Sequence, residues 1–211
     1  DKEMIYPDQF IPVLEKNGYV IDVDNFIWNK VCACIKMMED KGIEPVPISV
    51  NVSRMHVYQE KFTENLKNMA GEYGIDPKYI PLEITESAFT KEEGSLFKKV
   101  QSLQGYGFKF SMDDFGSGYS SLGMLKSERV DEVKIDKTFV DDIATDKGKV
   151  LLGNVIRMIN ELGIDMIAEG VETKEQADFL KENGCMYAQG YYYYKPMPIE
   201  EFAKLLENSA R

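Results

Sequence analysis

DEVKIDKTFVDDIATDKGKVLLGNVIRMINELGIDMIAEG, residues 131–170, contains the pattern that decides the fold. Its two ends, 131–136 and 164–170, are short β-rich runs, and a helical pattern at 148–162 separates them. Gly163 follows this helical pattern, and glycine is the residue that most often ends a helix. A strand, a helix and a second strand in this order predict a βαβ unit with two parallel strands.

The same alternation extends over most of the chain. Four further β-rich runs lie at 46–52, 79–85, 108–114 and 187–194, and the helical patterns between them lie at 60–73, 91–104 and 174–183. A last helical pattern occupies 198–208, and Gly184 ends the one before it. Strand starts are about 30 residues apart, the size of one unit in a barrel of eight βα units. We therefore predict an α/β fold with a parallel sheet, open or closed into a TIM-like barrel.

Some local signals refine this prediction. Two helical patterns begin with a capping box, formed by Thr90 with Glu93 and by Thr173 with Gln176. The four tyrosines at 191–194 are expected to continue the last strand, with alternate rings on opposite faces.

The first 45 residues differ from the rest. They hold two helical patterns, at 7–16 and 24–41, but no convincing strand, and the sequence has no starting Met. A closed barrel of eight strands would then lack its first two strands. We expect a single domain over 1–211 that is truncated at its N-terminus.

Composition excludes several classes of protein. The chain has 211 residues, 44% hydrophobic and 29% charged, which is the balance of a soluble globular protein, and it has no apolar run long enough for a spanning helix. The net charge of −11 repels phosphate backbones and anionic lipid, so we expect no nucleic-acid polymer as partner and no membrane contact. Three cysteines without a CxxC pair predict reduced thiols and a cytoplasmic location. His56 is the only histidine, which argues against multi-histidine metal sites and catalytic relays.

Polar residues gather where the predicted strands end. In chain order they are Asn51 and Ser53, Glu83 and Glu86, Asp113 and Asp114, Lys134 and Asp136, Glu169 and Glu172, and Gln189. A single carboxylate there has an ordinary explanation as a helix cap or a solvated loop residue. Six successive strands with polar ends favour an active site, because barrel enzymes carry their chemistry on that rim. Clustered carboxylates repel one another, so they need Lys134 and at least one divalent metal ion as counter-charge.

Oxygen ligands without Cys or His favour Mg²⁺, Mn²⁺ or Ca²⁺. Two such ions about 3.5–4 Å apart are a common solution for phosphodiester hydrolysis, and they would let an acidic protein bind an anionic substrate. The segment DDFGSGYSSLGML, 113–125, fits a mobile active-site loop better than a dinucleotide loop, because Ser121 replaces the third glycine of GxGxxG. Lys134 leaves an alternative open: a Schiff-base aldolase or an enolase-like barrel lyase.

The motifs as a set resemble the EAL-domain cyclic-di-GMP phosphodiesterases of bacterial signalling. The matching segments are PDQFIPVLEKNG (7–18), SVNVS (49–53), LEITES (82–87), MDDFGSGYSSLGML (112–125), VDEVKIDKTFV (130–140), IAEGVET (167–173) and QGYYYYKPMP (189–198). The resemblance implies a TIM-like barrel with one antiparallel strand, and metal-dependent hydrolysis of cyclic-di-GMP to linear pGpG with one or two Mg²⁺ or Mn²⁺ ions.

The resemblance also implies a role for each motif residue. Asn51, Glu83, Asp113 and Asp114 would be metal ligands, Lys134 would hold the metal-bound water, and Glu169 would be the general base. Glu86 and Glu172 would anchor the loop that contains Ser117, which replaces a usual Thr and keeps the hydroxyl, and Gln189 would line the metal site.

One family feature lies outside this sequence. In the family, the Glu-Ala-Leu motif that gives it its name precedes the PDQFIP segment (7–12). The motif contains a metal-binding Glu, with a substrate-binding Arg close behind it, and this chain is expected to start after that point. The chain is therefore expected to have impaired activity, and the alternative function is a sensor or protein-interaction module that binds cyclic-di-GMP without turnover. The resemblance further implies a homodimer and a flanking sensor or diguanylate cyclase-type domain.

Overall fold

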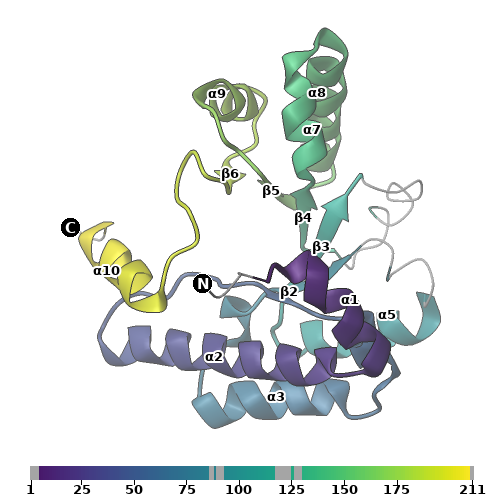
Figure 1. The fold of residues 1–211 in the computed structure, drawn as a ribbon, viewed down its shortest axis with the longest axis vertical. Helices are drawn as coiled ribbons and strands as arrows, with labels where there is room; N and C mark the ends of the chain where they lie inside the picture. The colour runs from purple at the N-terminus through teal and green to yellow at the C-terminus, as the bar shows by residue number, and fades with distance from the viewer. Residues whose placement is uncertain (1–4, 86–87, 89–92, 117–124, 126–129, 210–211) are drawn as a thin grey trace. The chain divides into compact units, whose positions relative to one another are not determined.

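The computed structural model describes residues 5–85, 88, 93–116, 125 and 130–209. The contacts divide the chain into two compact units. The first unit consists of Asp1–Leu82 with Gly94–Phe108, and the second consists of Glu83–Glu93 with Lys109–Arg211. Figure 1 shows the elements of both units, which are described separately below.

The first unit is mainly helical. Its elements are α1 (Pro7–Asn17), α2 (Val20–Asp40), β1 (Val50–Asn51), η1 (Arg54–Tyr58), α3 (Phe62–Tyr73), η2 (Pro77–Tyr79) and α5 (Glu93–Gln104), which enters this unit at Gly94. The long helix α2 packs on α3, and the two lie side by side in Figure 1. Residues that recur at helical spacing on one face of α2, Trp28, Cys32, Ile35 and Met38, are buried there and form much of this core.

The second unit contains the parallel sheet. Strand β2 (Leu82–Thr85) enters it at Glu83, and the strands β3 (Phe110–Phe115), β4 (Glu132–Ile135), β5 (Asp165–Ala168) and β6 (Tyr187–Ala188) follow one another in the sheet in chain order. Each neighbouring pair from β3 to β6 is parallel. The helices of this unit are α7 (Lys137–Asp141), η3 (Asp142–Ala144), α8 (Asp146–Glu161), α9 (Lys174–Glu182) and α10 (Ile199–Ser209). The predicted α/β class with parallel strands is confirmed.

Strand β3 contains an irregularity that bears on the site. Met112 pairs with Val133, but Phe115 pairs with Ile135, so β3 has one residue more than β4 over this stretch. Such a bulge redirects the side chains that it contains. The residues between the two pairs are Asp113 and Asp114, and Asp114 adopts a φ of 56°, the one positive φ among the described non-glycine residues.

Most predicted elements lie where the sequence placed them. All six strands overlap their predicted ranges, the capping box of Thr173 with Gln176 is present, and Gly163 and Gly184 have the positive φ of helix ends. The second capping box includes Thr90, which lies outside the described residues.

The prediction for 191–194 is wrong. Strand β6 ends at Ala188, and the backbone turns at Gly190, whose carbonyl accepts hydrogen bonds from Tyr193 N and Tyr194 N. The tyrosine rings are therefore exposed side chains of a turn and not the two faces of a strand. The short helix α7 was also missed, because its five residues are too few for a helical pattern to emerge.

Within the described part of the chain, no helix is both long and apolar enough to cross a lipid bilayer.

The close approach of η3 to α8 gives a stability prediction. A Cβ added to Gly148 would lie 2.0 Å from the backbone oxygen of Asp142, so Gly148→Ala must displace main chain. We expect the substitution to lower the free energy of unfolding by about 1–3 kcal/mol in urea denaturation followed by circular dichroism. Gly94→Ala in α5 is the control, because a Cβ there meets no atom within 4 Å and should stabilise the helix by about 0.5–1 kcal/mol. Equal stability of the Gly148→Ala variant and the unmodified protein would contradict this packing.

Candidate functional site

The ammonium group of Lys134 is the centre of a cluster of acidic side chains in the second unit. Lys134 lies on β4, and its Nζ is 2.6 Å from Glu169 Oε1, 2.8 Å from Glu83 Oε1 and 3.4 Å from Asp113 Oδ1. Glu83 is on β2, Asp113 is on β3, and Glu169 directly follows β5. Four successive strands thus bring one charged side chain each to the same place, as the sequence predicted.

Parallel pairing explains why Asp113, Lys134 and Glu169, from β3, β4 and the end of β5, meet. Lys134 pairs with Ile167 on β5, and the backbone N of Glu169 donates a hydrogen bond to the carbonyl of Ile135. This pairing continues the β4–β5 ladder by one step and fixes the start of the Glu169 side chain beside Lys134. The carboxyl ends of parallel strands meet at one edge of a sheet, which is the usual place for a site in this class of fold.

Burial makes the cluster electrostatically strong. The side chains of Lys134 and Glu83 are only 7% and 6% exposed. Burial alone would lower the pKa of Lys134, but the negative charges of Glu83 and Asp113 and the hydrogen bond to Glu169 outweigh it and raise this pKa above its ordinary value. Lys134 therefore stays protonated at neutral pH. A Schiff-base aldolase needs a neutral amine, so this environment disfavours that alternative.

For Glu169, in contrast to Lys134, burial has a stronger effect on the pKa than the neighbouring opposite charge has. Its burial raises the pKa of the carboxyl group, and the hydrogen bond from Lys134 only partly offsets this effect. Glu169 Oε1 also accepts a hydrogen bond of 2.7 Å from Gln189 Nε2, so two donors fix the orientation of the carboxylate. A carboxylate with a raised pKa and a fixed orientation is suited to accept a proton.

Asp113 and Asp114 have the properties of candidate cation ligands. Asp113 Oδ1 is buried and accepts no hydrogen bond, although Lys134 lies within ion-pair distance. Burial and the neighbouring charges of Asp113 and Asp136 raise the pKa of Asp114, whose backbone is held at positive φ by the bulge. A buried carboxylate oxygen without a donor, next to a second carboxylate, fits a hard cation such as Mg²⁺.

The described residues do not form a complete metal site by themselves. Among them, no three acidic, histidine or cysteine side chains are arranged to hold a metal ion. Lys134 lies at the point where Glu83, Asp113 and Glu169 converge, and its ammonium group takes the place of a cation there. Asp113 and Asp114 are therefore the residues of this unit that fit a metal ion best.

The remaining predicted site residues have different outcomes. Asn51 is the last residue of β1 in the first unit, where its backbone oxygen accepts a hydrogen bond from the Trp28 indole. Glu86 and Ser117 lie outside the described residues. Glu172 is half exposed and forms an ion pair of 2.7 Å with Lys137, and its predicted contact with the segment 117–124 falls outside the described residues too.

Sequence reasoning missed the partners behind these residues. Gln176 was recognised as half of a capping box, but its amide also reaches α7. Lys137 was not singled out, although it follows the strand of Lys134 by two residues. In the first unit, the buried His56 is bound to Asp24, which was not predicted either. None of these pairs has a spacing in the sequence that would have indicated it.

Comparisons with known proteins agree on one family. A family model described as "EAL domain" matches residues 1–196. Signaling protein YkoW of Bacillus subtilis is 33% identical over 207 residues, which are 98% of this chain and 26% of YkoW. A protein of Escherichia coli named "Probable cyclic di-GMP phosphodiesterase PdeG" is 33% identical over 203 residues, or 96% of this chain and 40% of PdeG. The chain thus spans well under half the length of these relatives.

Solved structures show the same fold. The structure titled "PaMucR Phosphodiesterase, c-di-GMP complex" matches with a TM-score of 0.89 and 30% identity, over 96% of this chain and 82% of that one. The EAL enzyme Bd1971, in a form described as bound to cAMP and cyclic-di-GMP, matches with a TM-score of 0.89 and 26% identity, over 96% of this chain and 56% of that one.

The buried position of Lys134 gives a prediction that needs no substrate. Lys134→Met leaves the buried cluster of Glu83, Asp113 and Glu169 without a counter-charge. The pKa of Glu169, which burial already raises, should rise further because the hydrogen bond from Lys134 is lost. We expect the free energy of unfolding to fall by about 3–5 kcal/mol at about pH 8 and by less at about pH 5, where Glu169 can take up a proton. Denaturation at both pH values, with a chelator present, measures the difference.

In the unmodified protein, the contribution of Lys134 to the free energy of unfolding should be the same at both pH values. The folded-state pKa of its Lys134 is raised, so the stabilising contribution of Lys134 is complete below the unfolded-state pKa and is lost only as pH rises through the folded-state value. The control is Lys109→Met, because the Lys109–Asp165 pair of the same sheet is exposed and should contribute little. A loss for Lys134→Met that does not depend on pH would contradict the assignment.

Proposed function

The chain belongs to the EAL domain family, and we propose that it is a metal-dependent phosphodiesterase that hydrolyses cyclic-di-GMP to linear pGpG. The observation that carries this proposal is the convergence of Glu83, Asp113 and Glu169 on Lys134. The resemblance assigns chemistry to all four residues, which come from four different strands. The names of PdeG and of the MucR complex support cyclic-di-GMP as the substrate.

Each residue of the cluster has a task in this reaction. Glu169 accepts a proton from the attacking water, whose oxygen forms a bond to phosphorus while the bond from phosphorus to a ribose oxygen breaks. The leaving ribose oxygen takes up a proton from solvent and becomes a hydroxyl of the linear product. Lys134, which remains protonated, orients Glu169 and supplies positive charge close to the phosphate. Gln189 donates to the same oxygen of Glu169 as Lys134 does, so the other carboxylate oxygen stays available for the proton.

We infer that one or two Mg²⁺ or Mn²⁺ ions act in this site, with Asn51, Glu83, Asp113 and Asp114 as ligands. The ions, when bound, polarise the phosphate and lower the pKa of water. The undonated oxygen of Asp113 and its acidic neighbour Asp114 support this assignment. Glu86 and Glu172 are proposed to anchor the loop containing Ser117.

The wider context is also part of the proposal. Residues 1–211 would form a single EAL domain, because the family match runs through both units. Flanking sensor or cyclase-type domains fit the greater length of the relatives, one of which is named a bifunctional diguanylate cyclase and cyclic di-GMP phosphodiesterase. Cys32, Cys34 and Cys185 are buried and form no disulfide, which fits the cytoplasm. A homodimer is proposed from the family resemblance.

The general base is tested by Glu169→Gln. Glutamine keeps the size of the side chain but cannot accept the proton, so we expect kcat to fall by about 10²–10⁴-fold. The whole protein is incubated with cyclic-di-GMP and Mg²⁺ or Mn²⁺, and the linear product is followed by chromatography. Glu175→Gln is the control, since Glu175 is an exposed residue of α9 that pairs only weakly with Lys149. Binding of cyclic-di-GMP without turnover by the unmodified protein would replace this proposal with the sensor function.

Metal binding is tested separately by titration calorimetry with Mg²⁺ or Mn²⁺ alone. Loss of an outer partner of a metal ligand already costs about 10–100-fold in affinity, so Asp113→Asn should weaken binding at least as much. Asp178→Asn, on the surface of α9, removes the same charge and should leave the affinity unchanged. Equal affinities of the Asp113→Asn variant and the unmodified protein would exclude Asp113 as a ligand.

A further inference from the structure

Helix α7 lies between two of the segments that form the site. It directly follows β4 through Asp136, whose side chain caps the helix by accepting a hydrogen bond of 3.0 Å from Thr138 N. A Cβ added to Gly116, just after β3, would lie 1.9 Å from the ring of Phe139 on α7. A Cβ added to Gly170, two residues after β5, would lie 2.3 Å from Cγ of Lys137. The ends of β3 and β5 therefore pack on α7 through glycines.

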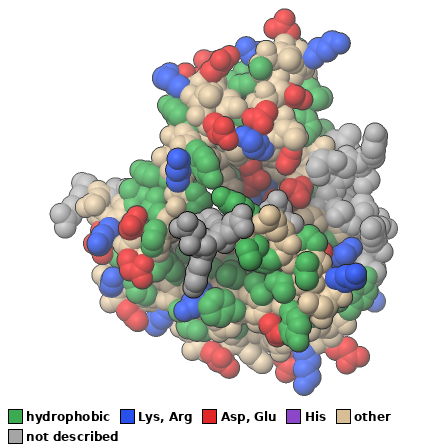
Figure 2. All heavy atoms as spheres, in the orientation of Figure 1, with side chains coloured by type: hydrophobic (Ala, Val, Ile, Leu, Met, Phe, Trp, Pro, Cys, Tyr) green, Lys and Arg blue, Asp and Glu red, His purple; other side chains and the backbone are tan. Residues whose placement is uncertain are grey.

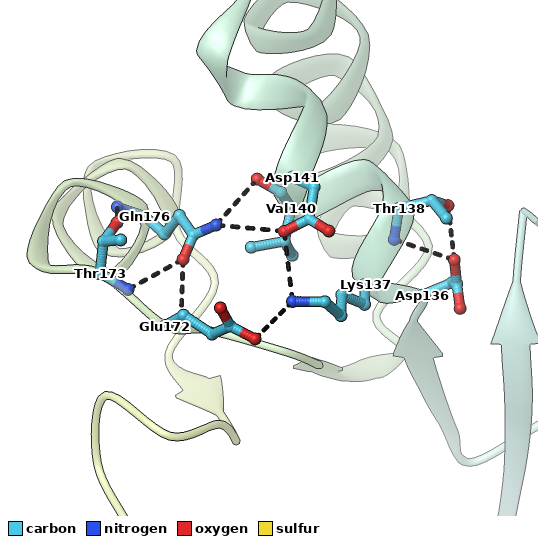
Figure 3. A network of polar contacts seen from close by, with 8 residues as sticks. All are labelled: Asp136, Lys137, Thr138, Val140, Asp141, Glu172, Thr173 and Gln176. Atoms are coloured by element: carbon cyan, nitrogen blue, oxygen red, sulfur yellow. Dashed lines mark hydrogen bonds and ion pairs between the residues drawn. The ribbon is translucent and has the colours of Figure 1, made fainter.

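The side chain of Lys137 crosses Gly170 before it reaches its partners. The Cβ, Cγ and Cδ atoms of Lys137 are the atoms that a Cβ on Gly170 would meet, so the aliphatic part of Lys137 covers this glycine. Its Nζ then lies 2.7 Å from Glu172 Oε1 and 3.4 Å from Asp141 Oδ1 (Figure 3). The lysine therefore holds the segment after β5 by packing and by charge.

Gln176 makes a second link between the same two segments. Its Oε1 accepts hydrogen bonds from the backbone N of Glu172 (2.7 Å) and of Thr173 (2.9 Å). Its Nε2 points to the carbonyl of Val140 and to Asp141 Oδ1, each at 3.5 Å, as the dashed lines in Figure 3 show. Gln176 is buried, so these contacts are protected from water.

The two lysines contact the segment after β5 in the same way. Lys134 binds Glu169, and three residues later Lys137 binds Glu172, three residues after Glu169. Between these contacts Gly170 has a φ of +67°, so the chain turns sharply directly after Glu169. Backbone hydrogen bonds hold Glu169 N to the carbonyl of Ile135 and Val171 N to the carbonyl of Gln189. Beyond Val171, the side chains of Lys137 and Gln176 hold the chain against α7.

We propose that Lys137 is a positioning residue that holds the segment Glu169–Glu172 against α7 and thereby keeps the Glu169 carboxylate in place for Lys134 and Gln189, the two donors that orient it. The importance of this orientation for turnover rests on the phosphodiesterase function proposed above. Nothing in the proposed chemistry requires Lys137 to touch the substrate, because its ammonium group is already bound to Glu172 and Asp141.

A purely stabilising role predicts a different result. The ammonium group of Lys137 and both of its partners are half exposed, and ion pairs in such positions contribute little to the free energy of unfolding. Figure 2 shows positive and negative side chains interspersed over the helices α7 to α9, and Lys174–Asp178 is another exposed pair there. Lys137 differs from Lys174 in that its partner Glu172 belongs to the segment that carries Glu169.

The test compares three variants of the whole protein. Lys137→Met keeps the aliphatic cover over Gly170 but removes the charge, whereas Lys137→Arg keeps both. We expect Lys137→Met to lower kcat about 5–20-fold with little change in KM, because small displacements of a reacting group are costly. Lys137→Arg should recover most of kcat, and Lys174→Met should match the unmodified protein. An unchanged kcat of Lys137→Met beside an active unmodified protein would overturn the proposal and leave the phosphodiesterase function intact.

Amide hydrogen exchange gives a readout that is independent of turnover. The amides of Glu172 and Thr173 should exchange several-fold faster in Lys137→Met than in Lys174→Met, while the melting temperatures of both variants stay close to that of the unmodified protein. If the unmodified protein hydrolyses no cyclic-di-GMP, the proposed function fails, and this measurement still decides whether Lys137 holds the segment. Unchanged protection of both amides would overturn the proposal.

Discussion

The ion pairs of Lys134 are the interaction on which the rest of the site depends. Three carboxylates from β2, β3 and the end of β5 converge on a single buried ammonium group. Without that group, the folded chain would have to neutralise these carboxylates or keep them apart, because unpaired charges are very costly to bury. The position of Lys134 on a central strand therefore lets an acidic chain concentrate further negative charge at one edge of its sheet. The same concentration of charge is what a divalent cation would bind.

Irregular backbone, rather than regular strand geometry, directs the remaining side chains. The bulge in β3 supplies the extra residue that places Asp113 and Asp114 near the strand end. As a result, the backbone of Asp114 adopts a positive φ, which is unfavourable for a residue other than glycine. Gly190 allows the turn after β6 to approach Val171 so closely that a Cβ would lie 2.1 Å from its carbonyl oxygen. The segment after β5 is therefore confined between α7 and the turn after β6, and this confinement orients the Glu169 carboxylate.

The order of the strands and helices and the residues of the central cluster could be predicted from the sequence, and the reason is physical. Strands and helices have different hydrophobic periods, so their order can be read from the sequence. Neighbouring parallel strands place their carboxyl ends at the same edge of the sheet, in chain order. Glu83, Asp113, Lys134 and Glu169 could therefore be grouped before any distance was known. The turn at 191–194 could not be predicted, because it depends on the close approach of Gly190 to Val171, and α7 could not be predicted, because its five residues are too few for a helical pattern. The same holds for Lys137 and Gln176, whose partners lie about 35 residues away or are backbone groups.

The contacts around α7 also show why a weak interaction can matter for a reaction. Stability depends on the difference in free energy between the folded and unfolded states, to which a half-exposed ion pair such as Lys137–Glu172 adds little. The rate of a proton transfer depends instead on how often the base has the correct orientation, and this depends on the local freedom of the segment that carries it. Gly170 and Val171 lie between Glu169 and Glu172, and glycine is the residue type with the fewest restrictions on its backbone. Because Gly170 follows the proposed general base, the contact of Lys137 with Glu172 is expected to influence the orientation of that base more than the stability of the fold.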